Sequence, residues 1–101
     1  MTEATHLDRA AALLLSVGQA ALGDIDTGAA LHCLHARALL CDGGAQPLPL
    51  APPRTVDSPT IARQTIRDAL AELAHLAPAA FAARPVLAAA HACQQALHEL
   101  Q

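Results

Sequence analysis

The sequence contains no lysine, tyrosine or tryptophan, and Phe81 is its one phenylalanine. Aromatic residues make up 1% of a chain that is 53% hydrophobic, so its core has to be built from alanine, leucine, valine and isoleucine. Alanine is the strongest helix former, and residues that favour strands are scarce. We therefore predict an all-α fold. Because each alanine buries little surface, self-association would add useful burial to so small a domain.

The sequence also has few basic residues. The six basic residues are all arginines, and the net charge is −3 at neutral pH. A nucleic-acid partner is therefore not expected, because phosphate backbones require a basic stripe. The absence of lysine combined with abundant alanine and arginine is typical of a high-GC bacterium.

Long apolar runs are missing as well. The longest purely aliphatic run, residues 10–15, is far shorter than the roughly 20 residues that cross a bilayer. The first residues contain acidic side chains and no positively charged segment of the secretory type. We expect a soluble cytoplasmic protein without a membrane partner, and the 101 residues fit a single domain, 1–101.

The sequence contains three cysteines. Cys33 and Cys41 lie on one predicted helix, about 12 Å apart along its axis, so they cannot form a disulfide with each other. We expect reduced thiols, with Cys41 and Cys93 as inert packing residues on apolar stripes. Cys33 is a candidate nucleophile because basic residues lie nearby, but neighbours along a helix point in different directions, which makes catalysis the less favoured interpretation.

Apolar residues recur every three or four positions in four segments, which predicts helices at about 7–22, 27–42, 58–77 and 85–100. Gly18 lies within the apolar stripe of the first, where the missing Cβ permits a close helix crossing. Ser58 followed by Pro59 is typical of a helix N-terminus. The proline-rich residues 43–57 are expected to form a crossover loop. Two helical hairpins joined in this way predict a four-helix bundle.

The segment 27–42 is apolar on nearly every side. One stripe consists of Leu31, Leu34, Ala38 and Cys41, and the other of Ala29, Cys33, Ala36 and Leu40. Such a helix is either central in its own fold or covered by another subunit. We therefore expect a homodimer formed through this helix.

Two patterns are candidates for metal binding. Glu72-x-x-His75, with a second copy at Glu3-x-x-His6, has the spacing used by carboxylate-bridged bundles. Glu72 and His75 lie opposite the apolar face of their helix, however, so we expect them to face solvent. His32 and His35 could chelate one ion, but two ligands do not make a site. We therefore predict no bound metal or other cofactor.

Two hypotheses about function follow. The first is a small, non-catalytic binding module that self-associates through the helix 27–42, with the proline-rich loop as a second contact. The second is a small-molecule site or small enzyme inside the bundle, lined by apolar side chains and made polar by His35 and Arg37, with His32 or His91 contributing. The sequence identifies neither a substrate nor a partner.

Overall fold

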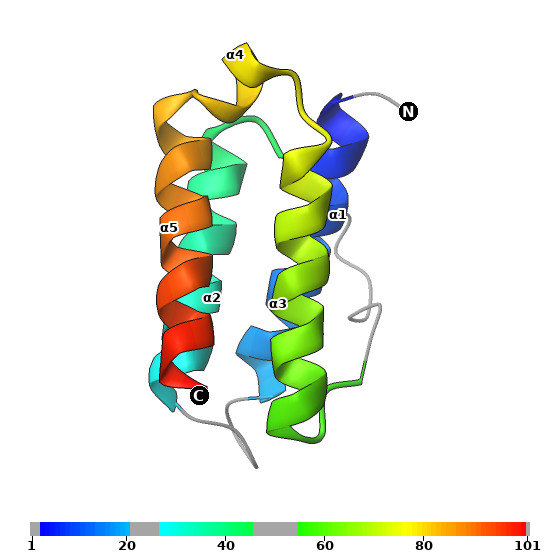
Figure 1. The fold of residues 1–101 in the computed structure, drawn as a ribbon, viewed down its shortest axis with the longest axis vertical. Helices are drawn as coiled ribbons and strands as arrows, with labels where there is room; N and C mark the ends of the chain where they lie inside the picture. Colours follow the sequence, from blue (N-terminus) through cyan, green and yellow to red (C-terminus); the bar gives the residue numbers. More distant parts are fainter. Residues whose placement is uncertain (1–2, 21–26, 46–54, 101) are drawn as a thin grey trace.

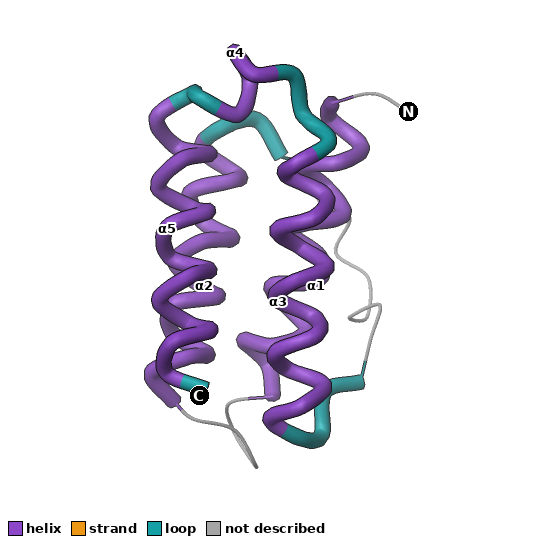
Figure 2. The backbone as a smooth tube through the Cα atoms, viewed as in Figure 1, coloured by secondary structure: helices purple, strands orange, loops and turns teal. Residues whose placement is uncertain are grey.

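The computed structural model describes residues 3–20, 27–45 and 55–100. The regular structure in these segments is entirely helical (Figure 2). The helices are α1 (Glu3–Ala20), α2 (Thr27–Asp42), α3 (Pro59–Ala74), α4 (Pro78–Phe81) and α5 (Arg84–Glu99). The prediction of an all-α fold is therefore confirmed.

The four long helices lie close to their predicted positions. α2 has the predicted bounds, whereas α1 begins at Glu3, before the predicted start at residue 7, and α3 ends at Ala74 rather than near residue 77. The predicted connector between the last two helices contains the single turn α4. The predicted end of the first helix at residue 22 and the four loop prolines between residues 47 and 53 lie outside the described residues.

Consecutive long helices run in opposite directions in each half of the chain, α1 against α2 and α3 against α5 (Figure 1). α1 packs against α2 and α3, α5 packs against α2 and α3, and α4 contacts α5. α2 and α5 share the most extensive contact, so the two halves are joined mainly by α1 on α3 and α2 on α5. No helix of the described segments is long and apolar enough to cross a membrane.

The core is built mostly from small side chains, as the composition predicts. Leu14, Leu40, Ile66 and Leu73 are its largest fully buried side chains. Around them are ten fully or nearly fully buried alanines from the four long helices: Ala10, Ala11, Ala29, Ala30, Ala36, Ala62, Ala69, Ala89, Ala92 and Ala96. Short side chains allow helix backbones to approach closely, and the resulting dispersion contacts replace the area that larger side chains would bury.

Two polar side chains, Ser16 and Thr65, are buried among the described residues. Each bonds back to its own helix: Ser16 Oγ donates to Ala12 O at 3.3 Å, and Thr65 Oγ1 donates to Ile61 O at 2.7 Å. Each hydroxyl is therefore hydrogen-bonded within its own helix.

Side chains also hold the helix ends. Ser58 Oγ accepts a hydrogen bond from Ile61 N at 3.2 Å, which confirms the predicted N-cap of α3. Arg63 Nη1 donates to Leu100 O at 2.9 Å, so a cation from α3 satisfies a carbonyl just after α5. A positive charge at a helix C-terminus is electrostatically favourable.

At Gly18 the backbone of α1 lies against a side chain of α2. A Cβ built on Gly18 would lie 2.6 Å from Leu34 Cγ and would also clash with Leu34 Cδ2. The side chain of Leu34 therefore occupies the space that any other residue at position 18 would fill. The close crossing predicted at Gly18 is confirmed.

Gly18→Ala is expected to destabilise the protein by up to about 2 kcal/mol. Overpacking costs about 1–3 kcal/mol, offset by about 1 kcal/mol of improved helix propensity. Urea unfolding of the variant against wild type measures the difference. In a Leu34→Ala background the same substitution should stabilise the protein, because the clashing side chain is gone. A stabilising effect in the wild-type background would contradict the contact.

Candidate functional site

α2 presents one of its two apolar stripes to the core and the other outward. The stripe of Ala29, Cys33, Ala36 and Leu40 is fully buried. We call the other stripe the outward face of α2: Leu31, Leu34, Ala38 and Cys41. Leu31 is 61% exposed and Leu34 is 38% exposed, and Ala38 and Cys41 are also exposed. Leu31 and Leu34 of the outward face therefore remain at least partly exposed, whereas Leu40 of the other stripe is fully buried.

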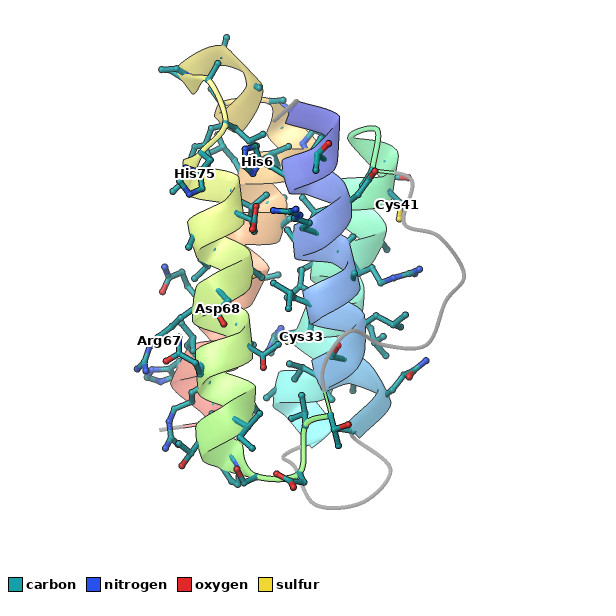
Figure 3. All side chains as sticks on the ribbon, turned by 90° about the vertical axis from the view of Figure 1, so that its right-hand side faces the viewer. His6, Cys33, Cys41, Arg67, Asp68 and His75 are labelled. Atoms are coloured by element: carbon teal, nitrogen blue, oxygen red, sulfur yellow. The ribbon has the colours of Figure 1, made fainter. Side chains whose placement is uncertain are left out.

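Cys41 corrects one prediction from the sequence. We expected it to pack in the core, but its side chain is exposed and points away from the neighbouring helices (Figure 3). Periodicity alone could not choose between the stripes, because both are apolar. The alanine-rich core favours the stripe with smaller side chains, since it allows a closer approach.

The polar residues of α2 that were predicted to form a ligand site lie on different sides of the helix. His32 and Arg37 are half-buried, whereas His35 is exposed. Successive helical residues are about 100° apart, so His32 and Arg37 are separated by about 140° around the axis and flank the core on opposite sides. Arg37 Nε is buried and has no hydrogen-bond partner.

His91 lies on α5 and is exposed. Its Nε2 is 3.5 Å from Nε2 of Gln95, one turn further along the same helix. The histidines His35 and His91 are therefore both at the surface, and neither points into the interior. Of the four predicted ligand-binding residues, His32 and Arg37 alone are partly interior.

The two buried cysteines, Cys33 and Cys93, are unreactive thiols at neutral pH. Burial raises the pKa of the Cys33 thiol to about 12, with a smaller contribution from the nearby Cys93. Burial likewise raises the pKa of the Cys93 thiol to about 12. Both thiols are protonated at neutral pH, so Cys33 lacks the thiolate that a nucleophile requires. Cys93 packs in the core, as predicted.

A polar cluster that the sequence did not predict joins the start of α1 to the end of α3. His6 Nδ1 lies 2.6 Å from Glu72 Oε2, and Arg9 Nη1 lies 3.9 Å from Glu72 Oε1. The side chains of His6 and Glu72 are 13% and 21% exposed, so this contact is partly shielded from solvent. Glu72 therefore does not face solvent as expected. It bridges two helices.

His75 extends the same cluster. Its ring stacks on that of His6, with ring centroids 5.1 Å apart and an interplanar angle of 21° (Figure 3). His75 itself is exposed, as the periodicity of α3 predicts. Nearly parallel rings do not direct their nitrogens at one point between them. No group of three potential ligands able to hold a metal ion occurs among the described residues.

The repeated Glu-x-x-His spacing could have indicated this cluster, but only if it were known that α1 lies beside α3. His6 belongs to one copy of the motif, and Glu72 and His75 to the other. Because α1 and α3 run in opposite directions, the beginning of one meets the end of the other (Figure 1). The sequence does not fix that pairing.

Comparison of the chain with models of known protein families, with curated proteins and with solved structures found no match.

Cysteine labelling tests the two thiol environments. In dilute native protein, one thiol of the three should react rapidly with a disulfide reagent such as DTNB, and Cys41→Ser should abolish that fast phase. Cys33 and Cys93 should react only when the protein unfolds, because both are buried and protonated. Rapid labelling of Cys41→Ser would show that the core opens far more readily than the structure implies.

A double-mutant cycle measures the contact between α1 and α3. Glu72→Gln and His6→Ala should each lower the free energy of unfolding, with a coupling energy of about 1 kcal/mol in view of their partial exposure. Urea unfolding of the two single variants and the double variant gives this value. Glu99→Gln, at an exposed position on α5, is the matched control and should change stability little. Full additivity of the two substitutions would mean that the contact contributes nothing.

Proposed function

We propose that this protein is a small, non-catalytic helical module that dimerises through the outward face of α2 and acts by binding. In this proposal, α1, α2, α3 and α5 form a four-helix bundle, with two copies meeting along α2. The observation that carries it is the exposure of Leu31 and Leu34 on a continuous apolar stripe.

The exposed stripe is unfavourable for an isolated chain. Fully burying a leucine side chain is worth about 1.5–3 kcal/mol relative to leaving it in water. Leu31 is 61% exposed and Leu34 is 38% exposed, while alanines, Cys33 and one leucine, Leu40, of the same helix are buried in the core. The sequence thus leaves two of the leucines of α2 on its outer side, which is typical of a face that a partner covers.

The spacing of this stripe supports a second helix as the covering element. Leu31, Leu34, Ala38 and Cys41 follow intervals of three, four and three residues. These are the intervals at which two helices interlock along a common seam. A second copy of α2 carries the same spacing, so one surface can serve both partners of a symmetric dimer.

The distribution of reactive groups supports binding over catalysis. The partly interior residues His32 and Arg37 lie on opposite flanks of α2, while His35 and His91 are exposed. The thiol of Cys33, buried in the core, is protonated at neutral pH because burial raises its pKa to about 12. These candidate groups therefore do not converge on one point where a substrate could react.

Leu31→Glu is expected to weaken the dimer at least about tenfold in Kd, because two carboxylates would enter an apolar seam. Sedimentation velocity over a concentration series gives Kd, and circular dichroism confirms that the variant is folded. Leu87→Glu is the matched control: Leu87 is 46% exposed on a different helix, near the start of α5, and should leave Kd unchanged. A wild-type protein that stays monomeric at high micromolar concentration would refute dimerisation through α2.

A further inference from the structure

We propose that the two copies of α2 pack parallel to each other, so that Arg37 of each copy lies beside Asp42 of the partner subunit. This inference rests on the dimer proposed above and specifies its orientation. It follows from the charged residues that flank the outward face of α2.

Arg37 and Asp42 lie on opposite flanks of the outward face. With about 100° per residue, Arg37 is about 80° from the centre of the face on one side, and Asp42 is about 60° from it on the other. These are the flanking positions whose charges set the orientation of paired helices. Neither residue forms an ion pair with another described residue, and Arg37 Nε has no hydrogen-bond partner.

In a parallel pair, a flanking residue meets the residue five positions later on the opposite flank of the partner. Arg37 therefore meets Asp42 of the partner subunit, and the two-fold axis repeats the contact, which gives two pairs of opposite charge. In an antiparallel pair, the same flanks meet each other. Arg37 would then lie beside Arg37 of the partner subunit, with two like charges at the centre of the interface.

The sizes of the seam side chains favour the antiparallel pair, but less strongly than charge favours the parallel one. Antiparallel pairing would place Leu31 against Cys41 of the partner subunit and Leu34 against Ala38 of the partner subunit, so that large side chains face small ones. Parallel pairing stacks two layers of leucine and then two layers of smaller residues. The distance between the helices would then narrow along the seam, which stays apolar throughout. This narrowing can be absorbed by a small tilt of the helices, whereas the antiparallel arrangement brings two guanidinium groups of like charge together. Charge therefore decides the orientation.

Cys41 reports the orientation directly. In a parallel pair, the two Cys41 residues share one layer of the seam, within the roughly 7 Å between Cα atoms that a disulfide spans. In an antiparallel pair, they lie about 15 Å apart along the axis, because ten residues separate position 41 from its counterpart at position 31. The exposed thiol is thus a native probe that requires no substitution.

The first experiment oxidises the full-length protein with copper phenanthroline and follows covalent dimers on a non-reducing gel. Wild type should form a covalent dimer, and Cys41→Ser should not, since Cys33 and Cys93 are buried. Leu31→Cys carrying the native Cys41 tests the other orientation. Efficient cross-linking that requires both the introduced thiol and Cys41, in a protein whose wild type does not cross-link, would establish the antiparallel pair and overturn the proposal.

The second experiment exchanges the charges. Arg37→Asp and Asp42→Arg should each raise the dimer Kd about fivefold, through the loss of two partly exposed ion pairs. The double variant should recover an affinity close to that of wild type. In an antiparallel dimer, the effect of Arg37→Asp would not depend on position 42, and the absence of recovery would overturn the proposal.

The two proposals fail in different ways. A wild-type protein that sediments as a monomer would refute the dimer itself. A stable dimer that loses affinity with Leu31→Glu but shows neither the Cys41 cross-link nor recovery in the charge exchange would retain the dimer through α2 and refute the parallel orientation.

Discussion

The packing of this protein depends on how closely helices can approach when alanine is the most frequent buried residue. Ten buried alanines of the long helices separate the few large core residues, and Gly18 brings α1 against Leu34 of α2. Close approach increases the number of atoms in contact for each side chain, which offsets the small apolar area that alanine removes from water. The stability of the core therefore depends on close contact between helices. Any group added where two helices cross, as at Gly18, would lower it.

The same constraint explains why α2 has leucines on its outer side. If helices must lie close together, the stripe that faces the core has to be the one with smaller residues, and the larger Leu31 is left outside. On α3 the requirement is weaker: Ile66 and Leu73 point inward, and a polar face opposes them. α2 is therefore the helix in which close packing and burial of apolar surface conflict, and a partner would resolve the conflict.

Much of the fold could be predicted from the sequence. The bounds of α2, the Ser58 cap and the role of Gly18 follow from local rules of periodicity, capping and backbone geometry. The side of α2 that faces the core did not follow, because both stripes are apolar. The contact of His6 with Glu72 depends on which helices are neighbours, and residues 66 positions apart carry no local signal of that. Periodicity placed Glu72 on the polar face of α3, but that face also lies beside α1.

Leu34 takes part in two kinds of contact at once. Within the chain it covers Gly18, and in the proposed dimer its exposed side would also belong to the seam between the two subunits. Folding and assembly would then share one side chain and be thermodynamically linked, so that the melting temperature of the protein would rise with its concentration. The position of α1 would also influence how Leu34 is presented to a partner, which makes the first helix a determinant of the geometry of the proposed interface.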